Sequence, residues 1–492
     1  MIDDLLKLST AWPLLLMVAG ATLALALGLF LSVDLGSRLR VEWMGAFFVG
    51  VPLSLVAGVI ITRRDLSLGE GSLFRPDIDD VVSGNWVSRG ITLVCIAIAI
   101  ERLVRFILRR EYRGARGLGV VALLLTYIGS ANFLSAFFGT PGGFTHHLVY
   151  APIIALAVFA YAQQNSDQCV LIVRNTLMVF LLASLIVLAV RPEMVAETRY
   201  RAGLIPGITL RFYGFATHPN TLAPLCLLLL CGIRLRRFKA PLLNIAGVTL
   251  AFVCLFLTQS KTSIGLVLIG AGWFWLLDRR ESLAAGGPAQ QRRWQGLSVA
   301  LGLLVVGLLG LVVLVALSVN DSFLPKLSQL VDRLQLTTLT GRTRIWDETL
   351  RAASQNWIFG YGPELWSVGF RIKVGLPFTH AHNQFIHAFG AAGVVGVLAL
   401  VAYLAGLARL AWRTRVASRG VTAVLFLYLL LRGLTELPIN ISNAMQGEFI
   451  VQIFLLVVCI GASQPRTLAA AASNAVSSPA FYSYRRAPGA LS

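Results

Sequence analysis

The chain has 492 residues, of which 57% are hydrophobic and only 13% are charged, and its mean hydropathy is +0.75. This composition excludes a set of soluble domains and indicates an integral membrane protein. The net charge of +19 is ordinary for a protein anchored in an anionic leaflet. The arginines are dispersed among short loops, which argues against nucleic acid as a partner.

Apolar runs of about 20 residues recur along the chain, and each is long enough to cross a bilayer as a helix. In lipid only helices or closed barrels satisfy the backbone, and continuous apolar runs favour helices. The sequence therefore predicts an all-α polytopic membrane protein with about 12–14 transmembrane helices. The first run is expected to be a retained helix and not a cleaved signal peptide. The expected spans are 11–33, 43–62, 88–108, 118–138, 147–164, 169–190, 215–232, 240–258, 262–278, 296–319, 383–410, 420–437 and 446–463.

The basic loops predict the orientation. Arginine-rich connections at 109–116, 234–239, 278–294 and 412–419 all fall on one side of the expected spans. By the positive-inside rule, that side is cytoplasmic and the other is periplasmic. One periplasmic connection, 191–214, nevertheless carries several arginines, which indicates either an anionic ligand or arginines near helix ends that reach lipid phosphates.

With this orientation the chain divides into four parts. Residues 1–319 are expected to form an N-terminal transmembrane helix bundle, 320–382 a large periplasmic loop, and 383–463 the C-terminal transmembrane helices. The remainder, 464–492, is rich in Ala, Ser and Pro and is expected to be a disordered cytoplasmic tail.

The large periplasmic loop is expected to contain short helices. Leucines and valine at helical spacing predict an amphipathic surface helix at 326–336. A second helix is predicted from about 343 to 357, with Thr340 or Thr343 capping its start. Such a helix start beside Arg342 is a favourable site for an anion.

No motif indicates nucleotide hydrolysis or a resident metal. A Walker-type phosphate loop, a dinucleotide fingerprint and a carboxylate cluster are all missing from the sequence. None of the cysteines has metal-ligand spacing with a histidine, so packing roles without disulfides are expected for Cys95, Cys169, Cys226, Cys231, Cys254 and Cys459.

Basic side chains are expected at periplasmic helix ends in three separate segments. Arg211 stands in Arg-Phe-Tyr-Gly-Phe-Ala-Thr-His-Pro-Asn (211–220), Lys261 stands in a tight hairpin, and Arg342 and Arg344 begin the loop helix. Ionisable groups at membrane depth usually mark a substrate path. For Lys261, an ordinary lysine at the aqueous end of a hairpin is an equally good interpretation.

Among the histidines, His382 is the candidate proton acceptor because imidazole accepts a proton near neutral pH and this one adjoins the arginines. His218 precedes a proline and is expected at a helix start. A zinc site through His380 and His382 is disfavoured, since no third ligand is apparent and side chains two apart diverge on a helix. Capping or packing is expected for His146, His147 and His387.

Three segments resemble the O-antigen polymerase and O-antigen ligase superfamily of integral-membrane glycosyltransferases, which use undecaprenyl-diphosphate-linked sugars. Residues 211–223 resemble the family's Arg…Gly…Pro-Asn…Leu-Ala segment. Residues 341–362 resemble its Gly-Arg…Trp…Gly-x-Gly stretch, and 380–396 its His-Asn segment and glycine-bearing helix. The order and spacing of the three make the set fairly specific.

The resemblance implies roles for individual residues. It makes His382 the essential histidine and makes Arg211 and Arg342 the contacts of the donor diphosphate, with Arg344 beside them. Lys261 stands where the family often has arginine, and lysine lacks the bidentate fork. The candidate assisting residues are His380, Asn383, His218 and Tyr213.

The implied reaction is an inverting transfer that needs neither metal nor other cofactor. The implied partners are undecaprenyl-diphosphate-linked donor and acceptor glycans, membrane lipids and a chain-length regulator, at a bacterial inner membrane with the active site facing the periplasm. Polymerisation of a surface polysaccharide or exopolysaccharide is the first expectation, and ligation to lipid A core the second. Transfer to a protein is a third variant. A transporter or lipid flippase is a further alternative, but paired interrupted helices are not evident.

Overall fold

The computed structural model describes residues 42–67, 86–200, 209–284, 342–376, 378–439, 441–442 and 444–464. Four of its helices are long and apolar enough to cross a membrane, and four shorter apolar helices accompany them. The expected all-α polytopic class is confirmed. The spans expected at 11–33 and 296–319, the surface helix at 326–336 and the expected tail from 465 onward lie outside the described residues.

The described elements, in chain order, are η1 (Trp43–Ala46), α2 (Phe47–Ile61), α4 (Trp86–Leu108), η2 (Glu111–Gly114), α5 (Leu118–Ile128), η3 (Gly129–Leu134), α6 (Ser135–Phe138), η4 (His146–Val149), α7 (Tyr150–Val190), α8 (Pro192–Val195), β1 (Ala196–Glu197), β2 (Arg211–Phe212), α9 (Pro219–Leu235), α10 (Pro241–Leu257), α11 (Lys261–Ala284), α14 (Arg342–Ser354), α15 (Val368–Val374), α16 (Gln384–Thr414), α17 (Val421–Arg432) and α18 (Gly447–Ala462). The two short strands pair antiparallel, with Glu197 opposite Arg211. Every expected span within the described residues has a helical counterpart.

Several expected boundaries differ from the structure, and two of the differences have a clear local cause. The spans 147–164 and 169–190 are joined as α7, in which Asn165 alone has non-helical dihedral angles. The intervening Asn-Ser-Asp-Gln contains no glycine or proline to end a helix. The span expected at 420–437 ends early, at Arg432, because the chain turns there and the amides of Thr435 and Glu436 both donate to the Arg432 carbonyl.

The helices α9, α11 and α17 are joined by polar contacts at both of their ends. At one end, Arg234 of α9 pairs with Asp278 of α11 at 2.7 Å and donates to the carbonyl of Arg419, just before α17. At the other end, Arg432 of α17 donates to Ser263 of α11 and to a carbonyl in the first turn of α9. The basic loops at 234–239 and 412–419, which are expected in the cytoplasm, therefore lie opposite the end that contains Arg432.

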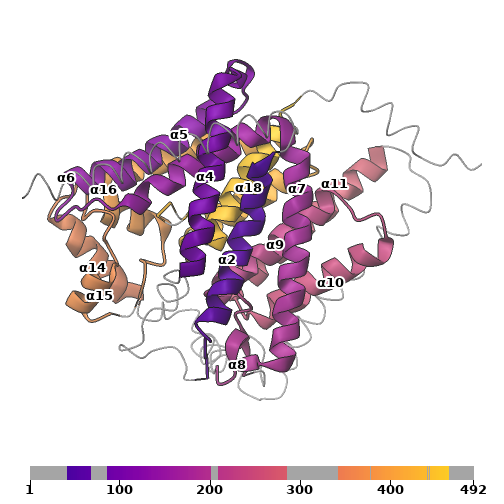
Figure 1. Ribbon diagram of the computed structural model, residues 1–492, viewed down its shortest axis with the longest axis horizontal. Coiled ribbons are helices and arrows are strands. Elements are labelled where there is room, and N and C mark those ends of the chain that lie inside the picture. The colour runs from indigo at the N-terminus through magenta and orange to yellow at the C-terminus, as the bar shows by residue number, and fades with distance from the viewer. Residues whose placement is uncertain are drawn as a thin grey trace, which may run out of the picture.

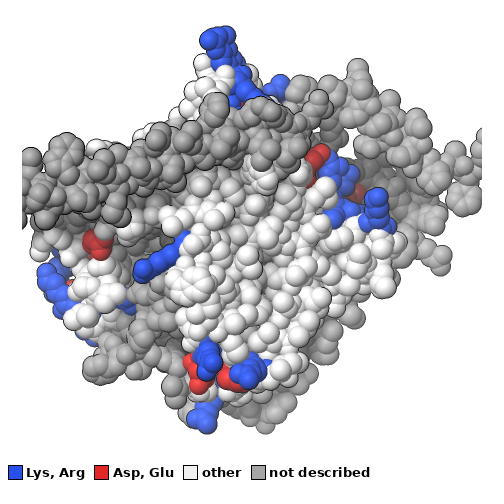
Figure 2. Space-filling model, viewed as in Figure 1, with Lys and Arg blue, Asp and Glu red and all other residues white. Residues whose placement is uncertain are grey.

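The outer surface agrees with a lipid-embedded body. Figure 2 shows a broad face over α2 and α7 with few charged side chains, and charged residues gather along its upper and lower borders. Inside, α18 is buried almost all round, from Phe449 to Ile460, and packs against α7 and α9. A helix that is apolar on every side belongs at the centre of a bundle.

A break in α16 receives the Gly-Tyr-Gly segment of the large loop. Gly393 has φ 61° and ψ −158°, a conformation open essentially to glycine alone. The carbonyls of Gly390 and Ala391 accept hydrogen bonds of 2.8 and 2.9 Å from the amides of Tyr361 and Gly362. This docking holds α14 against α16, and α14 and α15 lie together at one side of the main bundle (Figure 1).

Candidate active site

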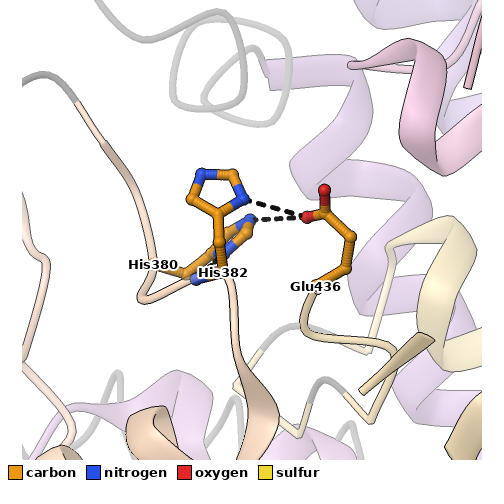
Figure 3. Close-up of side chains that lie close together, drawn as sticks. All are labelled: His380, His382 and Glu436. Carbon is orange, nitrogen blue, oxygen red and sulfur yellow. Dashed lines mark hydrogen bonds and ion pairs between the residues drawn. The ribbon is translucent and has the colours of Figure 1, made fainter. Parts of the chain in front are cut away.

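His382 and Glu436 form the centre of a polar cluster (Figure 3). The Nδ1 atom of His382 lies 3.0 Å from Glu436 Oε2, although the two residues are 54 positions apart in the chain. An ionised carboxylate only accepts hydrogen bonds, so the imidazole Nδ1 is the donor and Nε2 keeps its lone pair. His382 thus presents a nitrogen able to take up a proton. Its backbone has φ 48°, a left-handed value unusual for a residue other than glycine.

His380 approaches the same carboxylate from the neighbouring turn. Its Nε2 lies 3.9 Å from Glu436 Oε2, and the two imidazole rings are 4.1 Å apart at their centroids. The Nδ1 of His380 accepts a 3.1 Å hydrogen bond from the backbone amide of His382, so the proton of the neutral ring is on Nε2. Both imidazoles therefore direct N–H groups toward Glu436.

The surroundings keep Glu436 ionised and His380 neutral. Burial alone raises the pKa of Glu436, but His382, through its hydrogen bond and through its positive charge when it is protonated, outweighs burial together with Arg432 and holds that pKa well below its usual range. Burial lowers the pKa of His380 well below its ordinary value, the neighbouring His382 lowers it further, and Glu436 only partly opposes this. Glu436 is therefore an anionic acceptor surrounded by hydrogen-bond donors.

The loop helix α14 brings Arg342 to this cluster. The Nη2 atom of Arg342 lies 3.7 Å from Glu436 Oε1. One helical turn later, Trp346 Nε1 donates a 2.9 Å hydrogen bond to the carbonyl of Ala381, between the two histidines. Residues four apart share one face of a helix, so the Arg-x-x-x-Trp spacing fixes the histidine segment and the guanidinium together. The helix was expected at about 343–357 with Thr340 or Thr343 as its cap; Thr343 lies inside α14, and Thr340 lies outside the described residues.

The start of α9 contributes a further hydrogen bond to Glu436. Asn220 donates a 2.7 Å hydrogen bond from Nδ2 to Glu436 Oε1. His218 caps the helix, its Nδ1 accepting the Asn220 amide at 3.0 Å, as expected for a histidine at a helix start. The ring of Tyr213 packs edge-on against His218, 5.7 Å away, and is buried. His218 and Tyr213 therefore support Asn220.

Arg211 and Lys261 form a second cationic group. Arg211 lies in β2 with its guanidinium 4.5 Å from the ring centroid of Tyr200. Lys261 begins α11, and the two cations are near enough to interact electrostatically. The hairpin before Lys261 is tied to the Arg211 strand because Gln259 Nε2 donates to the carbonyl of Leu210 at 2.5 Å. The structure thus brings two of the sequence-predicted cations together.

Two predicted site residues, Arg344 and Asn383, are not part of the cluster around Glu436. Arg344 is on the exposed side of α14, and no described contact links it to Glu436. Asn383 caps α16, its side-chain oxygen accepting the amides of Phe385 and Ile386 at 3.0 Å each. Asn383 thereby sets the direction in which α16 leaves the histidine segment.

The cluster has the composition of a metal site. Ligand atoms of His380, His382 and Glu436 all lie within 4.8 Å of one another, so a third ligand is present that the sequence did not reveal. The expectation that the two histidines diverge was also wrong, because both precede α16 and neither is helical. The His382–Glu436 hydrogen bond and a metal would use the same nitrogen and oxygen atoms, so the two are alternatives at this site. Arg342 at 3.7 Å would repel a cation.

Sequence reasoning missed Glu436, Asn220 and Arg432. Glu436 and Arg432 fell inside the span expected at 420–437, where they were counted as part of an apolar run. A carboxylate and a guanidinium four apart within an expected span are themselves a sign of function, because charge at membrane depth is costly.

The fold and site define a polytopic helical membrane protein with a histidine–carboxylate–arginine cluster at one end of its helices. Residues 246–401, about a third of the 492, match the family model described as O-Antigen ligase. This segment is therefore similar to the O-antigen ligase family, which supports the resemblance to the O-antigen polymerase and ligase superfamily. The matched segment contains Lys261, Arg342 and both clustered histidines, but neither Arg211 nor Glu436. No curated protein matches the chain.

Proposed function

We propose that the protein is an inverting glycosyltransferase that moves a glycan from undecaprenyl diphosphate to a lipid-linked repeat unit, polymerising a surface polysaccharide or exopolysaccharide. The observation that carries this proposal is the His382–Glu436 hydrogen bond of 3.0 Å, with Arg342 beside the same carboxylate. The family match supports the reaction class.

In the proposed step, the acceptor hydroxyl oxygen attacks the anomeric carbon while the bond from that carbon to the phosphate oxygen breaks. The hydroxyl proton passes to His382 Nε2, and Glu436 stabilises the imidazolium that forms. The bonding electron pair leaves with the diphosphate, whose charge Arg342, Arg211 and Lys261 neutralise. One displacement inverts the anomeric centre. Diphosphate is already a good leaving group, so we propose no metal for the step.

The proposed location is a bacterial inner membrane with the site facing the periplasm. The cluster lies at the helix ends opposite the arginines of the 234–239 and 412–419 loops. Basic loops are retained in the cytoplasm, which supports the outward orientation of the site. The lipid tails of donor and acceptor would lie between helices in the outer leaflet.

A ligase that transfers the glycan to lipid A core is the second candidate, favoured by the description of the matched family. The polymerase is favoured by similarity of the Thr-Gln-Ser-Lys-Thr-Ser hairpin (258–263) and of the Gly-Arg-Thr-Arg-Ile-Trp segment (341–346) to exopolysaccharide polymerases. A polymerase would work with a chain-length regulator.

A deletion strain separates the two candidates. Loss of long polymer with single repeat units retained is expected for a polymerase. Long polymer that accumulates on undecaprenyl diphosphate would instead identify a ligase. Unchanged polymer and unchanged lipid-linked intermediates would contradict both. Complementation with the wild-type chain is the control in each case.

A further inference from the structure

Arg432 is the most deeply buried cation near the site, and the proposed transfer step does not use it. It ends α17 with 1% of its surface exposed. Its Nη1 donates to Ser263 Oγ at 2.6 Å and to Tyr428 Oη at 3.3 Å, and its Nη2 donates to the carbonyl of Asn220. These acceptors are neutral. A guanidinium removed from water without a directly bonded carboxylate is expensive, so its retention calls for a reason.

The contacts of Arg432 lead to Glu436 by three routes. Its carbonyl accepts the Glu436 amide at 2.8 Å, which fixes the backbone that carries the carboxylate. Its guanidinium holds Asn220, whose side chain donates to Glu436 Oε1 at 2.7 Å. Its charge is among those that keep Glu436 ionised.

The same guanidinium also contacts the start of α11, the helix that carries Lys261. Ser263, which accepts from Arg432, is two residues after Lys261 in the first turn of α11. Ser260 donates to Ser263 Oγ at 3.1 Å, so the hairpin that presents Lys261 belongs to the same network. One buried cation therefore joins the starts of α9 and α11 to the end of α17.

We infer that Arg432 is a positioning residue that holds Glu436 aligned for His382 while fixing the start of α11 that carries Lys261. The inference rests on the proposed function for its catalytic consequence and on the geometry alone for its effect on the His382 ring. The charged and titratable groups that act on Glu436 and Arg432 are His380, His382, Arg342, Tyr428 and Glu448.

The test compares Arg432→Gln and Arg432→Lys with wild type, as full chains in lipid nanodiscs. With a lipid-diphosphate glycan donor, Arg432→Gln is expected to lower kcat about 10- to 100-fold, the usual loss when an outer-shell partner is removed. The acid limb of its pH–rate profile should move to higher pH, because the hydrogen-bonded His382–Glu436 pair loses a nearby cation that disfavours its protonation. Arg432→Lys retains the charge and should leave the acid limb in place, with a smaller loss of kcat.

The matched control is Arg174→Gln. Arg174 is also buried, but its guanidinium packs on Phe238 and donates to the carbonyl of Arg236 at the opposite end of the bundle. The Arg174→Gln substitution should lower thermal stability without moving the acid limb of the pH–rate profile. If Arg432→Gln only reduces the amount of folded protein and keeps the wild-type pH profile, Arg432 is structural and the inference is overturned.

A second measurement needs no activity. Nitrogen-15 NMR of the six histidines, with His382 assigned from a His382→Gln sample, reports which ring nitrogen carries the proton. Wild type is expected to carry it on Nδ1, and Arg432→Gln should show a smaller Nδ1–H population while Arg174→Gln does not. An unchanged His382 ring in Arg432→Gln refutes the inference even if the protein proves to be no glycosyltransferase. A changed ring without transfer activity in wild type would refute only the proposed function.

Discussion

The indole Nε1 of Trp346 donates a 2.9 Å hydrogen bond to the carbonyl of Ala381, the residue between the two clustered histidines. The next residue, His382, has the left-handed φ of 48°. Backbone strain of this kind persists only where the surroundings over-determine it. The tryptophan of the loop helix thus acts on the orientation of the histidine without touching its ring.

Trp346→Phe should remove this hydrogen bond while retaining most of the apolar packing of α14. One hydrogen bond is worth roughly 1 kcal/mol, so we expect kcat/KM to fall about 5- to 10-fold with little change in thermal stability. Trp412→Phe, at an exposed position near the C-terminal end of α16, is the control. Equal kcat/KM for Trp346→Phe and wild type would contradict the role.

Two glycines of α16 are expected to matter for activity as much as the polar cluster around Glu436 does. A Cβ at Gly390 would lie 2.3 Å from the Thr349 side chain, and one at Gly393 would lie 2.3 Å from the Ile358 carbonyl in a left-handed backbone. Gly390→Ala and Gly393→Ala should displace α14 and lower activity at least about tenfold, through a clash of about 1–3 kcal/mol. Gly272→Ala, which meets nothing within 4 Å, should be neutral. Activity assays with a parallel melting curve distinguish the three.

Glu436→Gln tests whether the carboxylate is needed for its charge or only for its shape. The amide fits the same space but cannot stabilise an imidazolium, so we expect kcat to fall about 10- to 100-fold with a smaller change in KM. Glu348→Gln is the control, since Glu348 is on α14 and pairs with the exposed Arg351. A wild-type kcat for Glu436→Gln would show that the carboxylate does not assist His382.

Stability should decrease with acidification, and His380 should account for part of the decrease. Its pKa in the folded chain is well below the ordinary 6.5 because of burial, so below about pH 6.5 the unfolded chain binds a proton that the folded chain does not. The free energy of unfolding therefore falls as pH drops from 6.5 toward the folded value. The pKa of Glu436 also lies below its ordinary value of 4.5, so this group likewise makes the free energy of unfolding fall on acidification, beginning near pH 4.5. Melting temperatures in nanodiscs from pH 7.5 to 5.5 should fall less steeply for His380→Asn than for wild type; equal slopes would argue against a neutral, buried His380.

Much of the scaffold follows from local pattern. The apolar runs predicted the described spans because a backbone in lipid has few alternatives to a helix. The loop helix predicted from about 343 to 357 is present as α14, Arg342–Ser354. What local pattern concealed was the end of α17, because hydropathy averaged over 420–437 hides a turn after Arg432.

The site was predictable only in its separate parts. His382 and Arg342 could be singled out from residue type and resemblance, and the structure places both beside Glu436. Their shared partner could not be found, since a contact across 54 residues leaves no trace in spacing. The association of Arg211 with Lys261 depends on how two hairpins pack, which periodicity does not report.

The most direct test of the central claim is the rate of glycan transfer by purified His382→Ala in nanodiscs, with undecaprenyl-diphosphate-linked donor and acceptor and with EDTA present. His146→Ala, at an exposed histidine, is the matched control. We predict full activity for wild type and the control despite the chelator, inverted stereochemistry in the product, and a loss of about 100- to 10,000-fold for His382→Ala. Wild-type turnover by His382→Ala, or a strict requirement for a divalent metal, would contradict the account.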